Sequence, residues 1–270
     1  MKMRKLKALP ERKATRVRAV FTDIDDTLTH QGLLEAPAFD AMWKLHRAGI
    51  AVVPVTGRPA GWCDHIARTW PVAGIVGENG AFYYRYLPEK RALIRRFVQS
   101  EATRLRNQKK LHRLRAQILK AVPGAGIASD QAFRLHDLAV DYCEDVTPLG
   151  PEEVERIVEI FERAGATAKV SSIHVNGWFG RYNKLHMIKR FAKDALGLDL
   201  SAEADNDRAV YVGDSPNDEP AFAFFRLGVG VANVKAFTDQ MTHLPSYVSS
   251  RAGGRGFAQL ARHLLAHRRS

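Results

Sequence analysis

The chain has 270 residues, of which 46% are hydrophobic and 26% charged, with a formal net charge of +12 at pH 7. This composition is that of a globular protein with one large or two modest domains. Its apolar runs, such as residues 49–55, are too short to cross a bilayer. No apolar signal core follows the basic N-terminus, and the two cysteines, Cys63 and Cys143, exclude a zinc motif or disulfide framework. We therefore expect a reduced, cytoplasmic protein with no membrane partner.

Positive charge is concentrated in two regions. Residues 1–18 carry eight Lys or Arg against one Glu, and residues 85–120 carry twelve against two. We expect residues 1–16 to form a basic, flexible tail. The second region is expected to be a solvated helix face, because the helix there has no aromatic residues among its charges as base stacking would require. Nucleic-acid binding is the less favoured interpretation.

The first third of the chain alternates between strand-like and helix-like patterns. The expected elements are a strand at 17–22, a helix from Pro37 to Gly49, a strand at 50–55, a helix at 60–69 and a short strand at 74–76. Strands separated by helices of this length predict a parallel, doubly wound sheet.

The pattern changes in the middle of the chain. The expected elements there are strands at 82–86 and 93–98, a helix at 101–122, strands at 126–129 and 138–142, a helix at 151–164 and strands at 168–173 and 174–179. Consecutive strands mixed with two helices predict an α+β insert with an antiparallel sheet.

Alternation resumes in the last third. The expected elements are helices at 184–196, 216–225, 235–241 and 257–267 and strands at 209–212, 228–231 and 247–248. The predicted fold class is therefore α/β. Residues 17–81 and 182–270 form a doubly wound parallel-sheet core, and residues 82–181 form an inserted α+β cap domain.

Two aspartates follow the first strand. Asp23 and Asp25 lie in the sequence FTDIDDTLT, and a sharp turn after the strand would aim both at one pocket. A carboxylate can serve as nucleophile or as general acid in phosphomonoester hydrolysis. We assign the nucleophile to Asp23 and the general acid and base to Asp25, although an ordinary Asp-rich turn would look the same.

Two more carboxylates follow the strand AVYVG, in VGDSPND. Asp214 and Asp218 are hard oxygen ligands of the kind that Mg²⁺ prefers, and Asn217 is an uncharged donor that could contact phosphate. The same residues also resemble the start of a helix, where anions bind.

Thr56 and Lys184 complete the set. Thr56 ends a strand in the turn Thr56-Gly57-Arg58, whose hydroxyl and backbone N–H groups can bind phosphate oxygens. Lys184 begins a helix, where its ammonium would reduce carboxylate repulsion and neutralise charge on a transferring phosphoryl group.

Taken in order, DIDDT, VTG, Lys184 and GDSPND resemble the four motifs of the haloacid dehalogenase superfamily of aspartate-nucleophile phosphatases. The resemblance implies an aspartyl-phosphate formed on Asp23, with Asp25 as acid and base and with Thr56 and Lys184 on the phosphoryl group. It implies Mg²⁺ bound by Asp23, the Asp25 carbonyl and Asp214, with Asp218 direct or through water. Asp26 stands where many relatives have Gly.

The insert is similar to the large C2-type cap of subfamily IIB, the Cof, sucrose-phosphate and mannosyl-phosphoglycerate phosphatases. GENGAFYY is similar to an element of that branch and implicates Asn79 near the cap hinge. Substrate specificity is expected in the cap, where His174, Asn176, Trp178 and Arg181 could hold a sugar ring. An equal alternative is that Trp178 packs and the other three residues face solvent.

The expected function is therefore a Mg²⁺-dependent phosphomonoester hydrolase acting on a phosphorylated sugar or similar small metabolite. The alternative within enzymes is a phosphomutase acting on hexose phosphates. The sequence does not define the oligomeric state.

Overall fold

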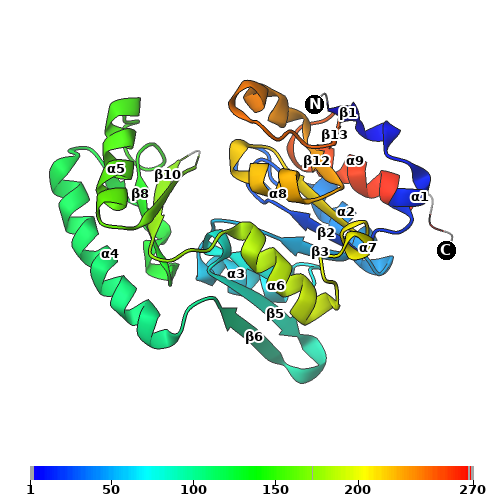
Figure 1. Ribbon diagram of the computed structural model, residues 1–270, viewed down its shortest axis with the longest axis horizontal. Helices are drawn as coiled ribbons and strands as arrows, with labels where there is room; N and C mark the ends of the chain where they lie inside the picture. Colours follow the sequence, from blue (N-terminus) through cyan, green and yellow to red (C-terminus); the bar gives the residue numbers. More distant parts are fainter. Residues whose placement is uncertain (1–2, 172, 267, 269–270) are drawn as a thin grey trace.

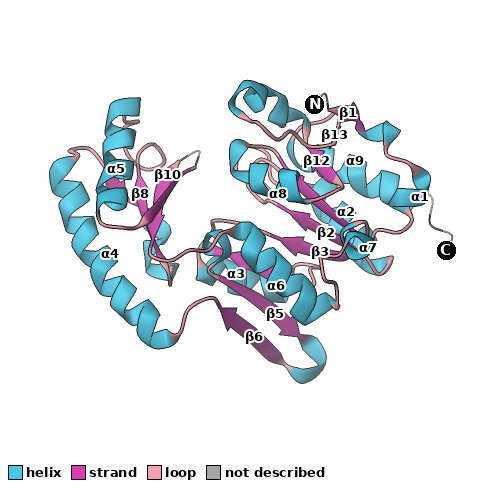
Figure 2. Cartoon of the chain, in the orientation of Figure 1, coloured by secondary structure: helices cyan, strands magenta, loops and turns pink. Residues whose placement is uncertain are grey.

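The computed structural model describes residues 3–171, 173–266 and 268. Figures 1 and 2 show a core built from both ends of the chain and an inserted unit, coloured green in Figure 1, at one side. Parts of three expected elements lie outside the described residues: residues 1–2 of the tail, residue 172 of a cap strand and residue 267 of the last helix.

The core contains a six-stranded sheet whose strand pairs are all parallel. Its order is β1 (Arg4–Lys5), β13 (Tyr247–Val248), β12 (Gly228–Gly230), β11 (Ala209–Gly213), β2 (Ala19–Thr22) and β3 (Ala51–Pro54). Every residue of β2 and β11 is buried, as expected for central strands of a sheet covered on both faces.

Helices cover both faces of this sheet. Strands alternate their side chains, so Val210 lies in one hydrophobic cluster with α2 (Ala36–Arg47) and α9 (Gly253–Leu265). Tyr211 lies in another, with α6 (Lys184–Leu196) and α8 (Glu219–Phe224). The remaining core helices are α1 (Glu11–Ala14), α3 (Ala60–Thr69) and α7 (Glu203–Asn206). The predicted doubly wound α/β core is confirmed.

Several connections are short 3-10 turns. They are η1 (Leu6–Ala8), η2 (Glu78–Gly80), η3 (Pro88–Lys90), η4 (Ser129–Phe133), η5 (Pro216–Asp218) and η6 (Ala232–Gln240). Two expected helices differ for this reason: η6 replaces the helix at 235–241, and the helix at 216–225 divides into η5 and α8.

A three-stranded antiparallel sheet lies where the cap was expected to start. It consists of β4 (Ile75–Gly77), β5 (Phe82–Leu87) and β6 (Ala92–Phe97), and a bridge between Val55 and Val76 joins it to the core sheet. Phe82 and Tyr83 are buried in the two core clusters. The hairpin β5–β6 therefore belongs with the core, and the insert begins near α4 and not at residue 82.

The insert is an α+β unit, as predicted. Its antiparallel sheet has the order β7 (Gly126–Ile127), β8 (Asp137–Asp141), β10 (His174–Trp178) and β9 (Thr167–Val170). Helices α4 (Glu101–Ala121) and α5 (Pro151–Arg163) pack on one face, where Ile118, Phe161 and Val175 share a hydrophobic cluster. We call this unit, residues 99–180, the cap.

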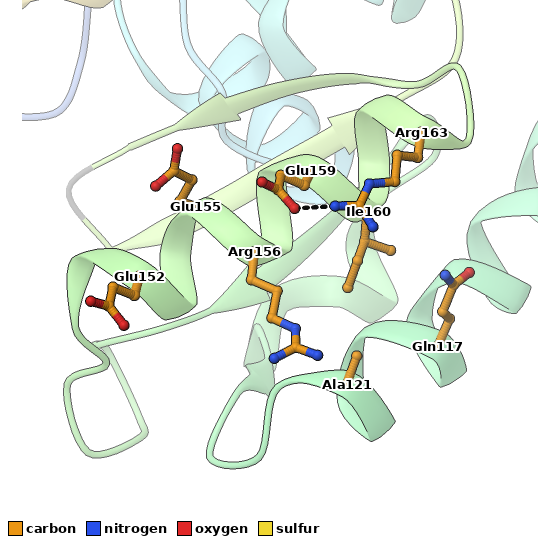
Figure 3. Close-up of a pocket in the computed structure, with 8 residues that line it drawn as sticks. All are labelled: Gln117, Ala121, Glu152, Glu155, Arg156, Glu159, Ile160 and Arg163. Atoms are coloured by element: carbon orange, nitrogen blue, oxygen red, sulfur yellow. Dashed lines mark hydrogen bonds and ion pairs between the residues drawn. The ribbon is translucent and has the colours of Figure 1, made fainter.

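A groove of about 510 Å³ runs between the two cap helices (Figure 3). Charged side chains border it, and Glu159 pairs with Arg163 along α5. Because its lining residues all come from α4 and α5, this groove belongs to the cap alone.

The N-terminal segment is folded and not a flexible tail. Arg4 and Lys5 form β1, which pairs with β13 at the edge of the core sheet. Leu6 and Leu9 are buried at 3% and 2% exposure, and His263 lies 2.9 Å from the Leu9 carbonyl. The expectation of a flexible tail was wrong because it was based on the many charged residues and overlooked the apolar side chains of Leu6 and Leu9, which pack in the core.

None of the described helices combines the length and apolar character needed to span a membrane.

Candidate active site

Three neighbouring parallel strands end at one edge of the core sheet. Asp23 follows β2, Asp214 follows β11, and Thr56 lies two residues beyond β3. In open α/β sheets, ligands bind at the carboxyl ends of the strands. The strand order therefore brings together three of the predicted site residues.

The Lys184 ammonium contacts the Asp23 carboxylate. Its Nζ, at the start of α6, donates a hydrogen bond to Asp23 Oδ1 at 2.5 Å and lies 3.7 Å from Asp218 Oδ1. Burial raises the pKa of Asp23, the Lys184 ammonium opposes this, and the carboxylates of Asp218, Asp25 and Asp214 add to it. Lys184 is thus the cation that offsets part of a concentrated negative charge.

Asp214 is fixed by two side chains that the sequence did not single out. Oδ1 accepts from the Thr27 hydroxyl at 3.0 Å, and Oδ2 accepts from the Asn233 amide at 2.9 Å. Asn233 also donates to the Asp26 carbonyl at 3.0 Å and so ties Asp214 to the turn after Asp23. Burial and then the charge of Asp218 raise the pKa of Asp214 to about 7.

Asp218 organises the turn after β11. Oδ1 accepts from the Tyr211 hydroxyl at 2.6 Å, and Oδ2 accepts from the backbone N–H of Asp214 at 2.9 Å. A capping box with Ser215 confirms the helix-start interpretation. Both carboxylate oxygens therefore accept from protein donors, and one of these bonds fixes the backbone of Asp214.

Asp25 and Arg58 form an ion pair. The guanidinium contacts both Asp25 oxygens, with Nη2 2.7 Å from Oδ1, and it stacks 4.6 Å above the Trp62 ring. Arg58, expected to bind phosphate or substrate, instead holds the expected general acid in this structure. The Asp25 side chain keeps 40% of its surface exposed.

The turn formed by residues 56–58 lies against Asn79. Thr56 Oγ1 accepts from the Arg58 N–H at 3.0 Å, and the Asn79 N–H donates to the Thr56 carbonyl at 3.1 Å. A Cβ on Gly57 would lie 3.1 Å from Asn79 Oδ1. The predicted phosphate loop and the predicted hinge residue are therefore neighbours.

Asn217 lies at the edge of this site. It is exposed, and its amide donates to the carbonyl of Val170 in cap strand β9 at 3.4 Å. In this structure it connects core to cap and is not among the residues that contact Asp23.

Three of the four cap candidates lie along one face of β10 and already contact other side chains. Along β10, His174, Asn176 and Trp178 alternate with Val175, which packs under the cap helices. His174 Nε2 lies 2.8 Å from Glu144 Oε2, and Asn176 donates to Asp137 at 3.0 Å. Trp178 is buried and stacks on Tyr182, so the packing alternative is confirmed for it. Arg181 is exposed.

The metal ligands implied by the resemblance are the carboxylates of Asp23 and Asp214 and the Asp25 carbonyl, with Asp218 direct or through water. In the described ranges, no three His, Cys, Asp or Glu side chains are grouped as metal ligands. The oxygen donors that suit Mg²⁺ here are fewer: the carboxylates of Asp23 and Asp214 and the Asp25 carbonyl. Mg²⁺ commonly uses one or two protein carboxylates together with phosphate and water. Burial, and after it the charge of neighbouring carboxylates, raises the pKa of both Asp23 and Asp214, which fits a cation beside them.

Neither a protein-family model nor a curated protein sequence matches the chain, whereas solved structures match it over nearly its whole length. A protein of Thermoplasma acidophilum is 18% identical, with 92% of this chain and 98% of that chain covered and a TM-score of 0.72. A haloacid dehalogenase-like hydrolase from Bacteroides thetaiotaomicron is 12% identical, with 92% and 99% covered and a TM-score of 0.66.

The sucrose-phosphatase of Synechocystis, solved with sucrose and phosphate, is 17% identical, with 91% of this chain and 97% of that chain covered and a TM-score of 0.62. These structural neighbours include haloacid dehalogenase-like hydrolases with the sugar-phosphatase architecture. The chain therefore has the haloacid dehalogenase-like α/β fold with an inserted cap. The fold expected from the four motifs is confirmed.

Proposed function

We propose that the protein is a Mg²⁺-dependent phosphomonoester hydrolase that works through an aspartyl-phosphate on Asp23. The observation that carries this proposal is the contact between Asp23 Oδ1 and Lys184 Nζ, with Asp214 and Asp218 beside them. A buried carboxylate held by an ammonium at the carboxyl edge of a parallel sheet is a positioned nucleophile. Lys184 occupies one oxygen, which leaves Oδ2 for attack.

In the first step, Asp23 Oδ2 forms a bond to phosphorus while the bond from phosphorus to the leaving oxygen breaks. Asp25 takes up a proton from the bound phosphomonoester or from solvent and passes it to that oxygen, while Arg58 keeps the Asp25 side chain in place. In the second step, Asp25 takes a proton from water, the water oxygen attacks phosphorus, and the Asp23–phosphorus bond breaks to give inorganic phosphate. Lys184 offsets the charge of the phosphoryl group in both steps.

Thr56 and the turn that follows it are proposed to hold the phosphoryl oxygens. Mg²⁺, held by Asp23, Asp214 and the Asp25 carbonyl, would supply electrostatic stabilisation of the transferring group. Asn233 and Thr27 keep Asp214 in place for this role.

We propose a phosphorylated sugar or related small metabolite as substrate. The support is the polar face that β8 and β10 present, with Asp137, His174 and Asn176, and the likeness to a fold solved with sucrose and phosphate. We also propose a cytoplasmic location, which is typical of a chain with two cysteines and no disulfide framework in its sequence.

The test is phosphate release from p-nitrophenyl phosphate and a panel of hexose phosphates, with Asp23→Asn as the control. Hydrolysis by the wild-type protein alone supports the proposal. Conversion of a hexose phosphate to its isomer with little free phosphate would indicate a phosphomutase instead. Wild-type rates in the Asp23→Asn protein would refute the assignment.

A further inference from the structure

Glu78 is a fully buried carboxylate at the boundary between core and cap. Its side chain has 0% exposure. Oε1 accepts from the backbone N–H of Ala60 at 3.0 Å and of Leu135 at 2.9 Å. Oε2 accepts from the backbone N–H of His136 at 2.6 Å and from His136 Nδ1 at 3.0 Å. Four donors therefore converge on one carboxylate.

These donors come from both parts of the molecule. Ala60 begins α3 of the core, and helix N-termini stabilise negative charge. Leu135 and His136 belong to the cap, between η4 and β8. Hydrogen bonds to a buried carboxylate are strong, and losing them leaves an unsatisfied charge. The Glu78 carboxylate thus joins the cap segment 134–136 to the start of α3.

Arg134 makes the reverse connection. This cap residue donates from Nη1 to the core carbonyl of Gly57 at 3.1 Å. The guanidinium is itself held by Asp130 at 2.9 Å and Asp137 at 3.1 Å. A core carboxylate therefore binds cap backbone while a cap guanidinium binds core backbone, and the core partner is the turn that contains Thr56.

The backbone at Glu78 is strained. Glu78 and Asn79 have φ values of 41° and 55°, in the left-handed region that costs non-glycine residues energy. Asn79 bonds to Thr56, and Gly80 packs so closely on Asn183, the residue before Lys184, that a Cβ would clash with it. One strained turn therefore contacts the phosphate loop, the start of the Lys184 helix and, through the Glu78 side chain, the cap.

We propose that Glu78 is a positioning residue that fixes the cap to the phosphate loop, so that the polar cap face meets the leaving group in one orientation. Its kinetic consequence rests on the proposed phosphatase function, whereas the clamp itself does not. Small misplacement of positioning groups can lower turnover by up to about 100-fold. The effect should be confined to substrates whose leaving group reaches the cap.

Glu78→Gln is the sharpest variant because it keeps the shape and places an amide NH₂ against two N–H donors. Asn206→Ala is the matched control. Asn206 is also buried and makes three hydrogen bonds to backbone groups, but it lies before β11, at the opposite end of the strand from Asp214. A loss of stability alone would affect both variants alike.

Hydrogen exchange tests the clamp without any need for activity. We expect the amides of Leu135 and His136 to be protected in the wild-type protein and to exchange at least about 10-fold faster in Glu78→Gln, with α4 unchanged. Arg134→Gln should give the same local change if Glu78→Gln does not fold. Fast exchange at these amides in the wild-type protein, or unchanged exchange in the variants, would overturn the clamp.

Kinetics test the positioning role. In Glu78→Gln, kcat/KM for the hexose phosphate that the wild-type protein hydrolyses fastest should fall about 10- to 100-fold, while that for p-nitrophenyl phosphate stays within about 3-fold. Equal losses for both substrates, as a lower active fraction would cause in Asn206→Ala, contradict positioning. If the wild-type protein hydrolyses no phosphate ester, the proposed function fails and the exchange result still decides the clamp.

Discussion

The Arg58 guanidinium donates hydrogen bonds to both carboxylate oxygens of Asp25 and stacks on the Trp62 ring. Asp25, the proposed general acid, is therefore held by Arg58, which the sequence pattern had predicted to bind phosphate. An acid that is oriented before the substrate arrives needs less reorganisation during proton transfer.

Arg58→Ala should therefore lower kcat for a hexose phosphate, whose leaving oxygen must be protonated, by about 10- to 100-fold, because general acid catalysis typically contributes about 100-fold or more. The control is Arg68→Ala. Arg68 pairs with Asp64 and stacks on Tyr86 near the surface of the core, so kcat should change less than about 2-fold. Full activity in Arg58→Ala would show that Asp25 needs no such support.

The folded N-terminal segment makes a prediction about stability. Leu9 is 2% exposed, whereas Leu105 on α4 is 54% exposed. Leu9→Ala should lower the free energy of unfolding by about 2–5 kcal/mol through lost burial and a cavity. Leu105→Ala should change it by less than about 0.5 kcal/mol. Denaturant titration gives both values, and equal effects would mean that the segment does not pack as described.

The hydrogen bond from Tyr211 to Asp218 should be worth more than an ordinary tyrosine hydrogen bond. It ends on a buried carboxylate at 2.6 Å, and hydrogen bonds to charged groups contribute about 1.5–3 kcal/mol. Tyr211→Phe should lose that amount. Tyr142→Phe removes a bond of equal length to the neutral Ser171 carbonyl and should lose about 0.5–1.5 kcal/mol. The free energies of unfolding test this order, and a smaller loss in Tyr211→Phe would contradict it.

Magnesium should stabilise the protein independently of turnover. A ligand that binds only the folded state adds about 2.7 kcal/mol at 100 times its Kd, so Mg²⁺ should raise the Tm, and EDTA should reverse this and stop phosphate release. Asp214→Asn should remove the gain. Asp40→Asn, which alters an exposed pair with Lys44, should keep it. A wild-type Tm that ignores Mg²⁺ would remove the metal from the mechanism.

The core and the grouping of the candidate site residues were predictable from the sequence because their signals are local. Asp23, Thr56 and Asp214 each follow a buried strand, and parallel strands place such residues at one edge. Because crossover connections between parallel strands are almost always right-handed, few other strand orders are possible. Lys184 was assigned to the same site because it matches a motif of the resembled superfamily. Its contact with Asp23 agrees with that assignment.

Other features depend on partners far along the chain, which no local pattern encodes. The hairpin β5–β6 reads the same whether it joins core or cap, and only the pairing with β4 decides it. Asn233 lies in the connection between the expected strand at 228–231 and the expected helix at 235–241, yet its amide fixes Asp214. The four donors around Glu78 come from residues up to 58 positions away, so the carboxylate looks like a surface residue in the sequence.

The most direct measurement is to quench a reaction with p-nitrophenyl phosphate in acid and to map the phosphorylated peptide by mass spectrometry. Our account predicts one phosphoryl group on the peptide that contains Asp23, lost on treatment with hydroxylamine and absent in Asp23→Asn. Steady turnover with the phosphoryl group on another side chain, or undiminished turnover in Asp23→Asn, would contradict it.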